Sequence, residues 1–126
     1  MNMTKKIDAI CISCTNEDDV LTVAVGDDYN DPKNYFIIGR FDEDDLTVDE
    51  CIGFQSDSTE YEIADAIEKV ELDDENLIVY LNDNAALKAG AKQYLAVLKN
   101  AKEINNLKRF LKKIFEDSSI DIIIKN

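Results

Sequence analysis

The stretch Asn100–Phe115, NAKEINNLKRFLKKIF, has the most regular pattern in this chain of 126 residues. Its apolar residues recur at intervals of three or four, which places them on one face of a helix. Asn100 and Glu103 have the spacing of a capping box, so we expect them to close the first turn of a helix that covers about 101–115. Such an amphipathic helix needs a surface on which to bury its apolar face. That face consists of Ile104, Leu107, Phe110, Leu111 and Ile114.

The segment before this helix predicts a sheet. Ile67–Leu72 and Leu77–Leu81 flank the polar residues Asp73–Asn76, which is the signature of a β-hairpin. A short helix at Asn84–Ala89, capped by Asp83, should end at Gly90. Further strands are expected at 7–15, 20–25, 35–40, 51–55, 60–63, 93–98 and 120–124, the first two of these forming a second hairpin.

Strands dominate this order and the long helix comes late, which is typical of an α+β domain. We therefore expect one domain over residues 1–126. It should contain an antiparallel or mixed β-sheet, a C-terminal amphipathic helix packed on one face, and one short helix.

The composition narrows the partners that the protein can bind. The chain has 27 acidic and 14 basic residues, and its formal net charge is -13. Such a protein is repelled by nucleic acids and by anionic membranes, so we expect neither as a partner. An odd number of cysteines, three, argues against a disulfide framework. No stretch approaches the roughly 20 apolar residues that span a bilayer. These features favour a cytoplasmic protein.

The residue types also argue against familiar catalytic and metal sites. The chain has no His, so imidazole-based catalysis is excluded and the commonest transition-metal ligand is missing. Cys11 and Cys14 lie on an expected strand, where residues three apart point to opposite faces. The acidic loops at 27–32 and 42–45 lack the glycine of a calcium-binding EF-hand. We expect no metal, no cofactor and no enzymatic activity.

The charge is unevenly distributed along the chain. Residues 1–83 contain 23 acidic and 5 basic residues, whereas residues 84–126 contain 4 and 9. Acidic loops can simply keep a protein soluble and protect sheet edges. They can also attract a basic partner. The candidate contact residues are Asp42, Glu43, Asp44, Asp45, Asp49 and Glu50; then Glu60 and Glu62, which an edge strand would project to one side; and Tyr29 or Tyr61 as an aromatic anchor.

Three segments together carry a resemblance to a known family: DPKNYFIIGR at Asp31–Arg40, LIVYL at Leu77–Leu81 followed by Ala85–Gly90, and Leu107–Phe115, which ends in LKKIF. In this order and spacing, over roughly Val20–Phe115, the chain resembles the tenth numbered family of immunity proteins of bacterial polymorphic toxin systems. The resemblance implies a small acidic α+β protein that binds and blocks the catalytic domain of a cognate toxin.

Two other functions remain open on the sequence alone. A nucleic-acid mimic would use the same acidity to inhibit a basic DNA- or RNA-binding protein of the host, and would act on many such proteins. A carboxylate-based enzyme is a weaker hypothesis, because no pair of acidic residues stands out. Pairing of edge strands between two copies is compatible with the sequence, although nothing in the sequence requires a homo-oligomer.

Overall fold

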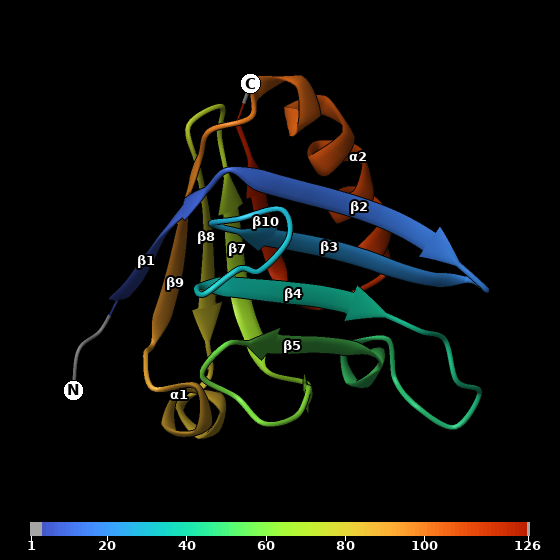
Figure 1. Ribbon diagram of the computed structural model, residues 1–126. Helices are drawn as coiled ribbons and strands as arrows, with labels where there is room; N and C mark the ends of the chain where they lie inside the picture. The colour runs from blue at the N-terminus through green and yellow to red at the C-terminus, as the bar shows by residue number, and fades with distance from the viewer. Residues whose placement is uncertain (1–3, 126) are drawn as a thin grey trace.

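A bend at Ile10 divides the first predicted strand between two sheets. The computed structural model describes residues 4–125, in which β1 covers Thr4–Ala9 and β2 covers Cys11–Glu17. The amide of Ile10 donates to the carbonyl of Asp8 at 3.0 Å, and this tight turn redirects the chain. The single strand expected at 7–15 is therefore wrong, and its two halves belong to different sheets (Figure 1).

The first sheet, sheet A, is mixed. Its strand order is β1-β9-β8-β7-β10, in which β1 is parallel to β9, β10 is parallel to β7, and the other pairs are antiparallel. The hairpin predicted on either side of Asp73 is confirmed. The carboxylate of Asp73 accepts the amides of Glu75 and Asn76 at 2.8 and 2.7 Å, which fixes the turn. The remaining strands are β7 (Ile67–Leu72), β8 (Asn76–Leu81), β9 (Gln93–Leu98) and β10 (Asp121–Ile124).

The second sheet, sheet B, is antiparallel in the order β2-β3-β4-β5-β6. The predicted β2–β3 hairpin is confirmed. The edge strand predicted at 60–63 is wrong, because β6 contains only Ile63 and Ala64, and Glu60 and Glu62 lie in the loop before it. The other strands are β3 (Val20–Gly26), β4 (Tyr35–Arg40) and β5 (Ile52–Ser56), and the 3-10 turn η1 (Asp49–Cys51) precedes β5.

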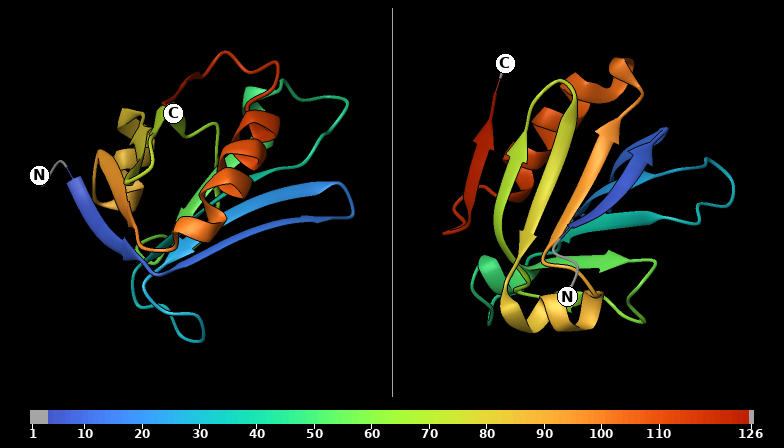
Figure 2. Two further views of the ribbon diagram at one scale, coloured as in Figure 1. Left: turned by 90° about the horizontal axis from the view of Figure 1, so that it is seen from above. Right: turned by 90° about the vertical axis from the view of Figure 1, so that its left-hand side faces the viewer.

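The long amphipathic helix lies between the two sheets. Seen from above, the sheets diverge, and α2 (Ile104–Ile114) occupies the opening along the inner side of sheet B (Figure 2). A 3-10 turn, η2 (Ala101–Glu103), precedes α2, so the predicted extent is confirmed. The predicted capping box is not formed, because neither Asn100 nor Glu103 makes a side-chain cap bond. The buried face of α2 is Ile104, Leu107, Leu111 and Ile114.

The short helix α1 (Asp83–Ala89) closes one end of sheet A (Figure 2). Its cap is Asn82 instead of the predicted Asp83, and the side chain of Asn82 accepts the amide of Ala85 at 2.9 Å. The helix ends at Gly90, as predicted, in the left-handed conformation that glycine adopts at low cost.

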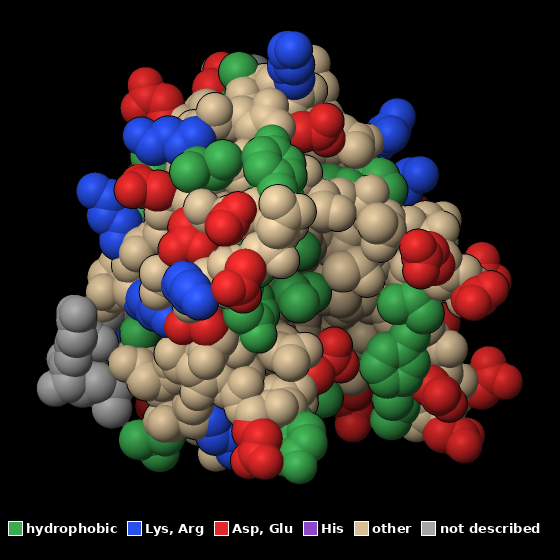
Figure 3. Space-filling view, in the orientation of Figure 1, with side chains coloured by type: hydrophobic (Ala, Val, Ile, Leu, Met, Phe, Trp, Pro, Cys, Tyr) green, Lys and Arg blue, Asp and Glu red, His purple; other side chains and the backbone are tan. Residues whose placement is uncertain are grey.

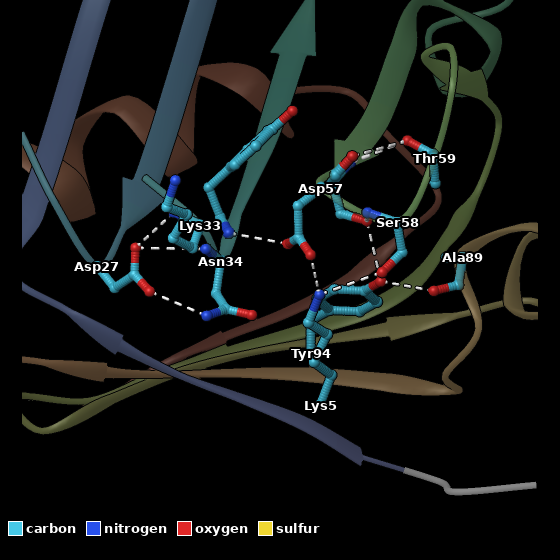
Figure 4. Close-up of polar contacts among 11 residues, drawn as sticks. Lys5, Asp27, Lys33, Asn34, Asp57, Ser58, Thr59, Ala89 and Tyr94 are labelled. Carbon is cyan, nitrogen blue, oxygen red and sulfur yellow. Dashed lines mark hydrogen bonds and ion pairs between the residues drawn. The ribbon is translucent and has the colours of Figure 1, made fainter. Parts of the chain in front are cut away.

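An aromatic cluster joins the two sheets. Tyr94 of β9 packs edge-on against Phe36 and Phe54 of sheet B, with ring centroids 5.8 and 5.0 Å apart. The buried Tyr94 hydroxyl lies 2.9 Å from Ser56 Oγ and donates to the carbonyl of Ala89 at 2.6 Å (Figure 4). Tyr94 therefore packs its ring between the two sheets while its buried hydroxyl keeps its hydrogen-bond partners.

The β2–β3 turn leads to a prediction about stability. Asp18 and Asp19 form its two-residue loop, and both have positive φ, which costs an L-residue energy and costs glycine little. We expect Asp19→Gly to raise the free energy of unfolding by about 0.5–1 kcal/mol relative to Asp19→Ala, a control that removes the same charge. Urea denaturation followed by circular dichroism measures both variants. Equal stability of the two variants would contradict the assignment of strain to this turn.

Candidate protein-binding surface

The predicted acidic loops lie around one sheet. Segments 17–19, 27–31, 42–50 and 60–62 all connect strands of sheet B, although they are distributed over nearly fifty residues of sequence. The remaining acidic run, Asp73–Glu75, joins β7 to β8 in sheet A. The fold therefore collects most of the predicted contact region on one side of the molecule.

On the side of sheet B that faces away from sheet A and α2, the strands contribute small or uncharged residues, and the Glu62 side chain from the loop before β6 crosses Gly53. We call this side the outer face (Figures 1 and 2). The alternating partners of the buried Val23, Phe36, Ile38 and Phe54 must point toward it. A partner that approaches this face meets these strand residues and the Glu62 side chain, which lies over Gly53. The outer face includes Thr22, Ala24, Ile37, Gly39, Gly53 and Gln55.

One end of sheet B combines acidic and exposed apolar side chains. The β2–β3 turn and the loop after β4 share a depression of about 640 Å³ that is lined by Asp18, Asp19 and Asp42 among others. Val20, Phe41 and Leu46 are 39%, 36% and 39% exposed there. Figure 3 shows acidic side chains gathered at this end, on the right of the view, with hydrophobic side chains between them. We call residues 18–20 together with 41–46 the acidic end.

Arg40 holds the loop of the acidic end in place. Its Nε donates to Asp42 Oδ1 at 2.9 Å, and its Nη1 donates to the carbonyls of Ile114 and Glu116 at 2.9 and 2.7 Å. The Ile114 carbonyl belongs to the last residue of α2 and the Glu116 carbonyl to the turn that follows, and the helix dipole also favours a cation at this end. The guanidinium thus connects the start of the acidic loop to the helix.

The six predicted contact residues of this loop fall into two groups. Asp49 accepts hydrogen bonds from Ser118 Oγ at 2.6 Å and the Ser119 amide at 3.0 Å, and these bonds lower the pKa of Asp49. Glu50 and Thr47 exchange hydrogen bonds between side chain and amide, which lowers the pKa of Glu50. Asp42 is paired with Arg40.

The carboxylates in the middle of the loop are placed differently. Within residues 4–125, no hydrogen bond or ion pair engages the side chains of Glu43, Asp44 and Asp45, all of which are exposed. The ordered ends of the loop therefore present three consecutive carboxylates to solvent. These three are the best placed of the predicted residues to meet a basic group.

Glu60, Tyr61 and Glu62 lie along the β6 side of the outer face. The Glu62 side chain crosses Gly53, where an added Cβ would come within 2.5 Å of Glu62 Cδ, and burial raises the pKa of this carboxyl. Glu60 and Tyr61 are exposed, Tyr61 to 73%. The predicted i, i+2 projection of the two glutamates is not formed, because Glu62 instead packs over the glycines.

Tyr29 lies at the end of sheet B opposite the acidic end, in the loop between β3 and β4. Its ring is 61% exposed, and its hydroxyl accepts a hydrogen bond from Asn100 Nδ2 at 3.2 Å. β3 has seven residues, so the two ends are roughly 20 Å apart. A protein–protein interface of standard size, with about 20–30 residues from each partner, can cover both ends of the sheet.

Several residues of this surface were not predicted. Val20, Phe41 and Leu46 look like ordinary strand or loop residues in the sequence. Only the fold leaves all three exposed and brings Val20 and Phe41 to one depression. Arg40 carried a weak signal, since a cation directly before an acidic run can pair with it. No group of three or more acidic or cysteine side chains suited to a metal is present in residues 4–125.

The comparisons with known proteins add no relative. Neither a scan of protein-family models nor a search of curated proteins returns a match for this chain. The resemblance to the immunity family stays a prediction that rests on the three quoted segments. No helix in the described part of the chain is long and apolar enough to cross a membrane.

Proposed function

We propose that the protein is a cytoplasmic immunity protein that binds a cognate toxin domain with a basic surface and neutralises it without catalysis. One observation carries this proposal: the acidic loops surround the outer face of sheet B, and the acidic end combines unpaired carboxylates with the exposed side chains of Val20, Phe41 and Leu46. The resemblance in sequence supports the same function.

The arrangement has the physical features of a binding surface. Exposed apolar side chains can be desolvated on contact, and carboxylates around them attract a basic partner and accelerate its association. Carboxylates can also occupy positions on a nuclease or other basic enzyme that a phosphate would otherwise take. Inhibition then requires only occupation of the partner's cleft.

Co-expression with the toxic domain encoded by the adjacent gene tests this function. We expect the protein to relieve the growth arrest that this domain causes. Persistent arrest, with both proteins present at comparable levels, would overturn the proposal. Protection against unrelated DNA-binding proteins, or competition with DNA for many of them, would instead support the nucleic-acid mimic.

A charge-reversal pair locates the contact. The double variant Asp44→Lys, Asp45→Lys should slow association with the toxin domain at least tenfold at low salt and weaken protection. The control Asp8→Lys, Glu75→Lys makes the same change in net charge at exposed positions of sheet A. Stopped-flow association at low and high salt measures both variants. Equal slowing by the two would show that only the net charge matters.

A further inference from the structure

A groove of about 430 Å³ opens on the outer face of sheet B beneath the loop that joins β3 to β4. Ala24 and Ile37 lie on the strands under it, and Tyr29 and Pro32 come from the loop above. Cys11 and Tyr35 also line it, so its walls are largely apolar and aromatic. The groove lies at the end of the sheet opposite the acidic end.

The loop over the groove is held in one conformation. Asp27 Oδ1 accepts the amides of Lys33 and Asn34 at 2.9 and 3.3 Å, and its Oδ2 accepts the Asn34 side-chain amide at 2.9 Å (Figure 4). Gly26 permits the close approach of Pro32, whose Cβ would lie 3.1 Å from a Cβ at that position. The groove therefore exists before any partner arrives.

One carboxylate at the groove remains available. Asp28 Oδ1 accepts the amide of Asn30 at 3.3 Å, and no cation in the described part of the chain pairs with this side chain. Asp28 and Cys11 both line the groove, and burial together with the charge of Asp28 raises the pKa of the Cys11 thiol. Asp31, by contrast, is paired with Lys33 at 3.0 Å.

We infer that this groove seats an arginine side chain of the partner. The inference rests on the proposed function, which requires a basic partner. Ala24, Ile37 and Pro32 would contact the methylene groups, and Tyr29 would stack on the guanidinium while Asp28 pairs with it. Arginine fits better than lysine, because a planar, weakly hydrated guanidinium stacks on aromatic rings and an ammonium does not.

The test uses the whole chain and a small probe, so it needs no toxin. N-acetyl-arginine N-methylamide should shift the backbone amide resonances of Ala24, Gly26 and Ile37, with a Kd of about millimolar. The uncharged norleucine analogue should not produce these shifts. The probe should also slow alkylation of Cys11, the thiol in the groove, relative to Cys14 on the opposite face and buried Cys51.

Three substitutions make the test specific. Asp28→Asn and Tyr29→Ala should each weaken arginine binding about fivefold, which corresponds to a cation–π contact or an ion pair of moderate exposure. Asp31 is not part of the groove lining, so Asp31→Asn should leave arginine binding unchanged. Absence of shifts at millimolar probe, or equal binding of norleucine, would overturn the arginine site. Arginine binding without relief of growth arrest would overturn the proposed function and leave the arginine site standing. Relief of growth arrest without arginine binding would overturn the arginine site and leave the proposed function standing.

Discussion

Tyr94→Ala should lower the free energy of unfolding by about 3–5 kcal/mol, the usual cost of removing a buried aromatic ring. Tyr94 is fully buried and is the residue of sheet A that contacts both Phe36 and Phe54 of sheet B. Its loss would leave a cavity where the two sheets meet. The free energy of unfolding of a domain of this size is about 5–15 kcal/mol in total. A loss of this magnitude can therefore prevent the variant from accumulating as a folded protein.

Tyr94→Phe separates the hydroxyl from the ring. The ring packing persists, but the Ala89 carbonyl and Ser56 Oγ each lose a buried hydrogen-bond partner. We expect a loss of about 1–3 kcal/mol. Because the chain has no Trp, urea titrations followed by circular dichroism are the suitable measurement. Tyr80→Phe is the matched control, since the Tyr80 hydroxyl bonds only the half-buried Glu71 at 3.2 Å. Equal losses in the two variants would show that the buried hydrogen bonds of Tyr94 stabilise the fold no more than the partly exposed bond of Tyr80.

The regular parts of the fold were predictable because local patterns determine them. The helix at Ile104–Ile114 follows from its apolar spacing, and the β7–β8 hairpin follows from two alternating runs around Asp73. The division into two sheets was not predictable. Alternation continues through Ile10, so nothing in the sequence marks the bend that sends β1 and β2 to different sheets.

The site was predictable in composition but not in arrangement. The acidic loops could be identified from the sequence, whereas their gathering around sheet B depends on long-range strand pairing. Two of the errors have tertiary causes. Asn100 gives its side-chain amide to Tyr29 and does not cap the helix, and Glu62 packs over Gly53 and does not extend β6. In both cases a tertiary contact replaced the locally preferred structure.

Arg40→Met should lower the free energy of unfolding by about 2–3 kcal/mol, because hydrogen bonds from a charged donor to the carbonyls at the end of α2 would be lost. The Arg40 side chain is 13% exposed, so water cannot fully replace the guanidinium at the carbonyls of Ile114 and Glu116. Methionine retains the aliphatic packing and removes only the charge and the donors.

The same variant should loosen the acidic end. Amide hydrogen exchange in residues 41–46 should become faster, and association with the toxin domain should weaken more than in Asp42→Asn. The latter variant removes one exposed ion pair, which contributes about 0–1 kcal/mol to stability. It leaves the hydrogen bonds from Arg40 to the end of α2 in place. If exchange in the loop were unchanged in Arg40→Met, the loop would be ordered independently of α2. If exchange rises as expected, the helix that completes the core also prepares the carboxylates for binding, because ordering them before contact reduces the entropy cost of association.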